Sequence, residues 1–217
     1  MLDGSFDFPS ETLCDIILQI RTQDGDMYKF NAHRLLLASK SHYFSILFTQ
    51  NINSHLELII LPPFFDPIAF DFLLKFLYEV EVSKPSVNLL LKILKIADHL
   101  HLVRNIKTAL SIYFNSIINA THIKDVVLLY KSLKTEYYDA KELYNEVLNT
   151  VEQILSTDIE RVITSKLLSK LPKDIAIHLL NLGLKDMNDN AVLGIILEEL
   201  KSYMKAGSFF QMLGLVS

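Results

Sequence analysis

Several residue types are scarce in this sequence of 217 residues, and each scarcity excludes a class of protein. A single cysteine, Cys14, excludes an intrachain disulfide and is typical of a protein from a reducing compartment. The formal net charge of −4 lacks the basic excess that is typical of nucleic-acid-binding proteins. Only six glycines are present, and no Gly-rich phosphate-binding motif occurs among them. The composition therefore disfavours a nucleotide-binding enzyme.

Long apolar runs are also missing. LELIILPPFF, residues 56–65, is far shorter than the roughly 20 residues that cross a bilayer. The start of the chain, MLDGSFDFPSETL, is acidic and lacks the basic start and apolar core of a signal peptide. Half of the residues are hydrophobic and only 21% are charged, which predicts a folded chain. We expect an intracellular protein, cytoplasmic or nuclear, that binds neither membranes nor nucleic acid.

The first third of the chain combines strand and helix patterns. CDIILQI, residues 14–20, alternates in the way of a half-buried strand. Asp24-Gly25 predicts a hairpin turn, and MYKF, residues 27–30, reads as the returning strand. A third apolar strand is predicted over residues 58–61, where a Pro-Pro pair ends it.

Helical signals dominate from Asp66 onward. Asp66 is a favourable N-cap because Pro67 follows it at the first helical position. Ser86 is predicted to cap the next helix, and a further helix is expected over residues 103–117. Up to this point the sequence predicts a small sheet with a cluster of helices.

The second half is predicted to be entirely helical. Its best amphipathic stripe lies within residues 140–155. TDIE, residues 157–160, matches a capping box at the start of a helix. Pro172 lies near the start of another helix, which Gly183 is predicted to end as a left-handed cap, and Asn188 is predicted to begin the last one. Short connections between such helices favour antiparallel hairpins.

FNAHRLLLASKSHYF, residues 30–44, raises the question of catalysis. His33 is predicted to begin a short helix, Ala38-Ser39 is small enough for a close approach of two helices, and Ser41 is predicted to cap the second helix. The element reads as a helical hairpin against a sheet edge. Two interpretations of its histidine are open: a catalytic or metal-binding group, or a buried structural residue, which is favoured because buried polar groups find hydrogen-bond partners.

The same stretch resembles the core signature of the BTB (POZ) domain. That signature has an Asp before the first strand, a hydrophobic-x-Ala-His-Arg/Lys turn, and two helices that read Leu-Ala-Ser-x-Ser-x-x-Phe. The matching positions are Asp15, Ala32, His33, Arg34, Leu37, Ala38, Ser39, Ser41, Phe44 and Phe48. The later segments LIIL, FDFLLKFLYE and LLKILKIADHLHL are similar to the family's later strand and helices. The resemblance covers about half of the chain.

LLSKLPKDIAIHLL, residues 167–180, is similar to the Leu-Pro-x-x-x-hydrophobic segment of the BACK domain, which follows BTB in many substrate adaptors. The two resemblances imply an α+β BTB/POZ fold, a small sheet with helical hairpins, followed by an all-α BACK-like domain of helical hairpins. We expect an N-terminal extension at 1–12, a BTB/POZ domain at 13–118, a BACK-like domain at 119–206 and a C-terminal tail at 207–217.

The resemblance implies a non-enzymatic adaptor, without a cofactor, that links a cullin-3 ubiquitin ligase to its substrate or competes for it. Family members that bind cullin tightly carry a hydrophobic-x-Glu triplet, which falls here on Ile52, Asn53 and Ser54. Ser54 in place of the glutamate predicts weaker cullin binding, by on the order of 1–3 kcal/mol. The expected partner-binding residues are Ile52, Asn53, Ser54, Leu56, Tyr78 and His101.

The family's homodimer usually uses a helix before the first strand, and this sequence departs from that pattern. The first twelve residues contain Gly4 and Pro9, which cost ~1 and ~3 kcal/mol relative to alanine inside a helix. The sequence therefore leaves the homodimer open, because the N-terminal dimerisation helix is short or absent. The residues after 207 are too few for a substrate-recognition domain, so we expect that it was removed or that the BTB–BACK surface acts alone. The alternative function is a structural or transcriptional scaffold that self-associates through BTB without binding cullin.

Other chemistry has little support in the sequence. His99 and His101 have the best metal-ligand spacing, but i and i+2 do not face each other on a helix, and two partly exposed imidazoles at a helix end are expected instead. Cys14 lacks the local signature of a thiol enzyme and is expected to be a buried structural residue. EYYDAKE, residues 136–142, reads as a solvated face. No pattern makes a positive case for an enzyme or for a metal site.

Overall fold

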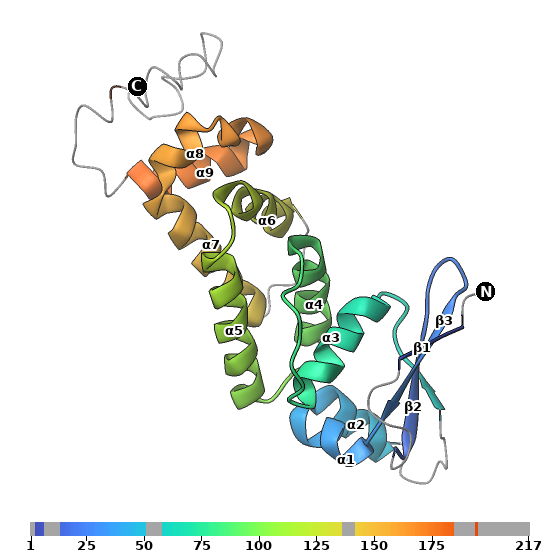
Figure 1. Ribbon diagram of the computed structural model, residues 1–217. Coiled ribbons are helices and arrows are strands. Elements are labelled where there is room, and N and C mark those ends of the chain that lie inside the picture. Colours follow the sequence, from blue (N-terminus) through green and yellow to red (C-terminus); the bar gives the residue numbers. More distant parts are fainter. Residues whose placement is uncertain (1–2, 7–13, 51–57, 136–141, 185–193, 195–217) are drawn as a thin grey trace. The chain divides into compact units, whose positions relative to one another are not determined.

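The computed structural model divides into two compact units (Figure 1). The first comprises residues 1–114 and 140–144, and the second comprises residues 115–139 and 145–217. The structure describes residues 3–6, 14–50, 58–135, 142–184 and 194.

A four-stranded sheet lies in the first unit (Figure 1). Its strands are β1 (Asp3–Phe6), β2 (Ile16–Arg21), β3 (Met27–Ala32) and β4 (Leu58–Ile60). Their order is β1-β3-β2-β4; β2 and β3 are antiparallel, while β1 runs parallel to β3 and β4 runs parallel to β2. The stretch that was expected to be an N-terminal extension thus contains a strand, and β1 and β4 form opposite edges of the sheet.

The predicted β2–β3 hairpin is confirmed. Ile16, Leu18 and Ile20 share the face of β2 that is buried, with at most 2% of each residue exposed. Gly25 in the turn has φ +89°, which a residue without Cβ adopts readily. The backbone N–H of Gly25 donates to the carbonyl oxygen of Thr22 at 3.1 Å. Alternation and turn chemistry together fix which face of the hairpin enters the core.

Helices complete the first unit. They are α1 (Arg34–Lys40), α2 (His42–Gln50), α3 (Pro67–Leu77), α4 (Val87–His99) and the first part of α5 (Arg104–Asn119). The sheet contacts α3 through aromatic rings, because Phe30 on β3 meets Phe70 edge-on with ring centroids 5.0 Å apart.

The predicted caps of α3 and α4 are confirmed. Asp66 Oδ1 accepts from the backbone N–H groups of Ile68 at 3.1 Å and Ala69 at 3.0 Å. Ser86 Oγ accepts from the N–H of Leu89 at 3.3 Å. Each side-chain oxygen satisfies a donor that the first helical turn leaves without an intrahelical acceptor.

The second unit is helical in its described part. Its elements are the end of α5, α6 (Ile123–Thr135), α7 (Glu142–Thr157, which begins in the first unit), α8 (Ile159–Thr164), the 3₁₀ helix η2 (Leu167–Lys170) and α9 (Lys173–Leu184). The stripe predicted on α7 is confirmed, since Val147, Val151 and Leu155 have 0% exposure. The division between the units falls inside α5, and the domain boundary expected after residue 118 stays a prediction.

The capping box predicted at residues 157–160 is wrong. Helix α7 runs on through Thr157, whose Oγ1 donates back to the carbonyl oxygen of Gln153 at 2.8 Å. Asp158 takes the N-cap position of α8 and makes no side-chain cap bond within the described structure. Thr157 still belongs to α7, so the N-cap position of α8 falls on Asp158, and the threonine hydroxyl bonds the preceding turn instead.

The left-handed cap predicted at Gly183 is also wrong. Gly183 lies inside α9, which continues to Leu184. A Cβ at this position would lie 2.7 Å from Cβ and Cγ1 of Ile159 on α8. The glycine is required by the close approach of the two helices and not by a turn. The helix predicted from Asn188 lies outside the described residues.

Candidate partner-binding surface

The junction between α1 and α2 is held by one buried hydroxyl. Ser41 has extended backbone (φ −141°, ψ 125°) and 0% exposure. Its Oγ donates to the carbonyl oxygen of Leu100 at 2.6 Å and accepts from the N–H of Phe44 at 3.3 Å. The predicted cap at Ser41 is confirmed, and the same hydroxyl attaches the start of α2 to the end of α4.

The turn after α4 runs along this junction. The N–H groups of His42 and Tyr43 donate to the carbonyl oxygens of His101 and Leu100 at 3.1 and 3.3 Å. In return, Val103 N–H donates to the carbonyl oxygen of Lys40 at 3.0 Å. His101 is exposed and has φ 46°, in the left-handed region that favours glycine. Backbone pairing therefore places His101 next to the first turn of α2.

The end of α3 also contacts the α1–α2 junction. The Lys40 ammonium donates to the carbonyl oxygen of Leu77 and pairs with Glu79 Oε1 at 2.8 Å. Glu79 has φ 60°, and the N–H groups of Glu79 and Val80 donate to the carbonyl oxygens of Phe76 and Lys75. These bonds form a Schellman motif with glutamate at the position usually taken by glycine. The hydrogen bond from Lys40 lowers the pKa of Glu79.

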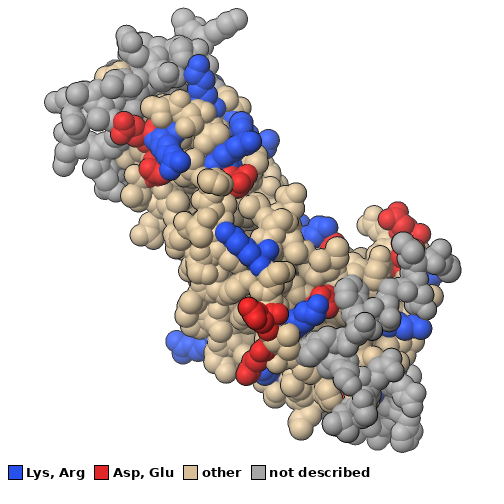
Figure 2. Space-filling model, viewed as in Figure 1, with Lys and Arg blue, Asp and Glu red and all other residues tan. Residues whose placement is uncertain are grey.

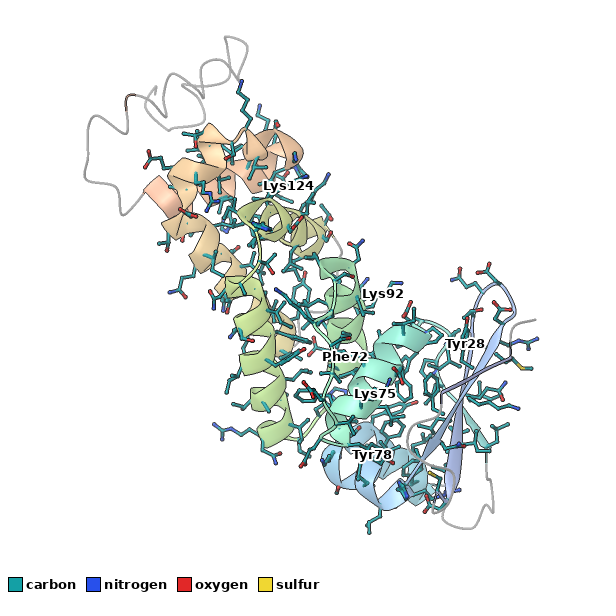
Figure 3. All side chains as sticks on the ribbon, viewed as in Figure 1. Tyr28, Phe72, Lys75, Tyr78, Lys92 and Lys124 are labelled. Atoms are coloured by element: carbon teal, nitrogen blue, oxygen red, sulfur yellow. The ribbon has the colours of Figure 1, made fainter. Side chains whose placement is uncertain are left out.

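His33 and Tyr78 form a pair at the start of α1. The backbone N–H of His33 donates to the Tyr78 hydroxyl at 2.8 Å, and His33 Nδ1 lies 2.8 Å from the same oxygen. Figure 3 shows Tyr78 at the end of α3, close to α1. Desolvation by burial raises the pKa of Tyr78 to about 12, so the hydroxyl is neutral at physiological pH. His33 is half-buried rather than buried, and its hydrogen-bonded structural interpretation is supported by this contact.

Comparison with known sequences identifies the fold. A sequence model of the BTB/POZ domain matches residues 7–118. The chain belongs to the BTB/POZ family. Kelch-like protein 7 from Homo sapiens is 32% identical over 78 residues, which are 36% of this chain and 12% of that protein. The proteins of that name from Rattus norvegicus and Gallus gallus are 32% identical over 77 residues, with 36% and 12% covered. The alignment thus spans 12% of the length of these relatives.

The BTB signature residues have identifiable structural roles. Asp15 Oδ1 accepts from the N–H of Arg34 at 2.8 Å, which fixes the turn between β3 and α1. Ala32, Leu37 and Phe44 have 0% exposure. The remaining signature residues lie on α1 and α2. Ala38 is half-buried, and Ser39 is exposed, with its Oγ donating to the carbonyl oxygen of Leu36 at 2.8 Å. Phe48 is 8% exposed, and its ring stacks on that of Phe44. The buried residues among them belong to the core of the first unit.

The structure describes only part of the predicted contact set. Ile52, Asn53, Ser54 and Leu56 lie outside the described residues. Tyr78 and His101 are described, and both adjoin the α1–α2 junction, Tyr78 through His33 and His101 through His42. The Tyr78 hydroxyl pairs with His33, so its half-exposed ring is the part that can meet a partner. We call residues 40–43, 78–80 and 100–103 the hinge surface.

Two charged residues of the hinge surface were not predicted. Lys40 and Glu79 are paired across α1 and α3, although they are far apart in the sequence. No rule of sequence spacing predicts this pair. The available signals were the position of Lys40 between two serines of the signature and the position of Glu79 directly after FLLKFLY. In the face drawn in Figure 2, charged side chains of both signs are interspersed among uncharged ones.

His99 and Cys14, the other candidates for metal or thiol chemistry, lie in different surroundings. His99 lies among aromatic rings, with centroids 5.0 Å from Tyr43, 5.0 Å from Phe64 and 5.6 Å from Phe65. Within the described ranges, no group of three or more His, Cys, Asp or Glu side chains is arranged to hold a metal ion. The prediction that Cys14 is buried is wrong: it precedes β2 and is half-buried.

None of the helices that the structure describes has the length and apolar character needed to span a bilayer.

Proposed function

We propose that this BTB protein is a non-enzymatic adaptor that binds a helix from the N-terminal region of cullin-3 and links a ubiquitin ligase to its substrate, or competes for that ligase. The observation that carries the proposal is the hinge surface. Residues 40–43 form hydrogen bonds with the end of α3, with the turn after α4 and with the residue that precedes α5. A surface fixed in this way loses little conformational entropy when a partner binds.

The chemistry of the hinge surface suits an amphipathic helix. Val80 after α3 is apolar and 37% exposed, and Ile46, on α2 beyond the hinge surface, is 43% exposed. Glu79, with 80% of its side chain exposed, and the exposed His101 supply polar groups on the hinge surface. Helix-in-groove recognition uses such apolar anchors with a polar rim. The function requires no cofactor and no catalytic group.

The resemblance to BACK extends the proposal to the second half of the chain. In this arrangement residues 13–118 are the BTB domain and residues 119–206 are a BACK-like domain that spaces a substrate from the ligase. The support is that α6, α7, α8 and α9 are helices and that Leu171-Pro172 precedes α9, as in the BACK-like segment. The proposed compartment is the cytoplasm or the nucleus.

The test is a calorimetric titration of this chain with the N-terminal region of cullin-3. Ser54→Glu restores the triplet's glutamate, and we expect it to tighten binding roughly five- to hundredfold, the equivalent of about 1–3 kcal/mol. Ser165→Glu is the matched control, because it adds the same charge at an exposed serine of the second unit. Equal affinities for the wild type and both variants would exclude the triplet as a contact.

A titration without heat from any variant at high concentration would remove the cullin proposal. If the chain then sedimented as a species heavier than a monomer, the alternative function, a self-associating scaffold without cullin binding, would replace it. A melting temperature raised by a specific small ligand would instead reopen the question of an enzyme.

A further inference from the structure

The solvent-facing side of α6 carries two lysines with a leucine between them. Lys124, Leu128 and Lys131 are all exposed, Leu128 by 39%. At about 100° per residue, the three positions lie within roughly 60° of one another around the helix. Tyr130 and Leu133, with 0% and 2% exposure, lie on the opposite side of α6 in the core of the second unit. We call Lys124, Leu128 and Lys131 the basic stripe.

The charge of the basic stripe is entirely positive. Asp125, the acidic residue of α6, lies about 90° around the helix from the centre of the stripe. Lys134 pairs with Glu152 at 2.7 Å, whereas Lys124 and Lys131 make no ion pair with any residue that the structure describes. Solvated helix faces usually combine both signs at spacings of three or four residues, which stabilises the helix. The basic stripe lacks this internal pairing.

The element that packs against α6 is also basic. This element is η2, which Lys166 precedes and Lys170 ends, and both lysines are exposed. No Asp or Glu occurs between Arg161 and Lys173 in the sequence. Figure 2 shows several basic side chains over the second unit, and Figure 3 shows Lys124 on α6. A chain with a formal net charge of −4 thus carries a local concentration of positive charge.

We propose that the basic stripe binds an acidic amphipathic helix of a partner protein, whose contacting face has acidic, apolar and acidic residues at the same spacing. Lys124 and Lys131 are two helical turns apart, about 10.5 Å along the axis. A helix laid along α6 places carboxylates at its positions i and i+7 near the two ammonium groups. An apolar side chain at i+3 or i+4 then packs on Leu128.

Charge and apolar content favour an acidic helix over other anionic partners. A nucleic acid is a long polyanion, which the net charge of −4 repels, and the basic stripe has no aromatic ring on which a base can stack. An anionic membrane requires a larger apolar face than one leucine with 39% exposure. A short helix meets mainly the local charge, because charges beyond ~8 Å are screened at physiological salt.

The inference is independent of the cullin proposal. The basic stripe lies in the second unit and the hinge surface lies in the first, so the failure of one binding test leaves the other unchanged. Exposed ion pairs contribute little individually and are screened by salt. We therefore expect a weak complex that dissociates further as the salt concentration rises.

Fluorescence anisotropy of the full chain with a labelled peptide tests the proposal. The probe is an alanine-rich helical peptide of about 20 residues that contains Glu-x-x-x-Leu-x-x-Glu, and the same peptide with both glutamates replaced by glutamine is the control probe. The glutamate peptide should bind, and an increase from about 50 to about 300 mM NaCl should weaken its binding severalfold. Equal affinity for the two peptides would overturn the proposal.

Charge reversal locates the binding surface. Lys124→Glu combined with Lys131→Glu should weaken binding of the glutamate peptide roughly tenfold or more, because two attractions become two repulsions. Lys29→Glu combined with Lys84→Glu is the matched control, since it makes the same change in net charge at two exposed lysines of the first unit. Equal melting temperatures check that both variants fold. Equal weakening by the two double variants would overturn the proposal.

The apolar contact and the class of partner are tested with the same assay. Leu128→Ala should weaken binding of the leucine peptide severalfold but leave unchanged the binding of a peptide with alanine at that position. Equal losses for the two peptides would contradict the pairing of the leucines. A single-stranded oligonucleotide or a phosphatidylserine vesicle that binds more tightly than the peptide, and loses binding in the Lys124 and Lys131 double variant, would overturn the proposal in favour of nucleic acid or membrane.

Discussion

Removal of the Ser41 hydroxyl is the sharpest test of how the hinge surface is held. Ser41→Ala leaves the carbonyl oxygen of Leu100 without its 2.6 Å donor and the N–H of Phe44 without its cap. An unsatisfied buried acceptor costs about 1–3 kcal/mol, and a lost N-cap costs about 1 kcal/mol. We expect the free energy of unfolding to fall by about 2–4 kcal/mol, measured by urea denaturation with far-UV circular dichroism.

The adjacent serine provides the control. Ser39 is exposed, and its Oγ donates to the carbonyl oxygen of Leu36 within α1. Ser39→Ala removes a hydroxyl from the same segment but leaves no buried group unpaired, so a change within about 0.5 kcal/mol is expected. Equal losses in the two variants would refute the argument that burial of the Ser41 hydroxyl holds the junction.

Three further predictions concern other contacts. Gly183→Ala should destabilise the wild type by about 1–3 kcal/mol, because the added Cβ meets Ile159. In an Ile159→Ala background the same change should stabilise the protein by up to ~1 kcal/mol; urea melts of the wild type, the two single variants and the double variant measure both effects. The pKa of Tyr78 is raised to about 12 in the folded state, so the stabilisation by its neutral hydroxyl is complete below pH ~10 and is lost as the pH rises through 12. Tyr78→Phe should therefore show a smaller loss of stability over this pH range, measured by thermal melts. Glu152→Gln should lower the unfolding free energy of the second unit by about 1–3 kcal/mol, because Oε1 accepts from Lys134 and the Tyr130 hydroxyl; an equal loss in the exposed Glu146→Gln would refute this.

Local signals predicted the first unit because they act within a few residues. The alternation of β2, the glycine of the hairpin and the caps at Asp66 and Ser86 each depend on neighbouring backbone. The family signature then placed these elements in one fold. The BACK resemblance and the domain boundaries have no comparable support and stay predictions.

Two features were missed because the contacts that decide them are distant in the sequence. Gly183 resembled a helix end, but the side chain of Ile159 on another helix decides its role. Lys40 and Glu79 meet only because α1 and α3 are brought together by the fold. The left-handed backbone of Glu79 likewise occurs where sequence rules expect glycine. Tertiary packing overrides a local preference worth about 1 kcal/mol in such cases.

The central claim is that the hinge surface receives a helix of the cullin-3 N-terminal region. Amide hydrogen exchange of the full chain, alone and with a saturating amount of that region, tests it most directly. The account predicts slower exchange at residues 42–56, 78–81 and 99–103 and unchanged exchange in α8 and α9. Protection confined to the second unit, or no protection at a concentration where the two proteins bind, would contradict it.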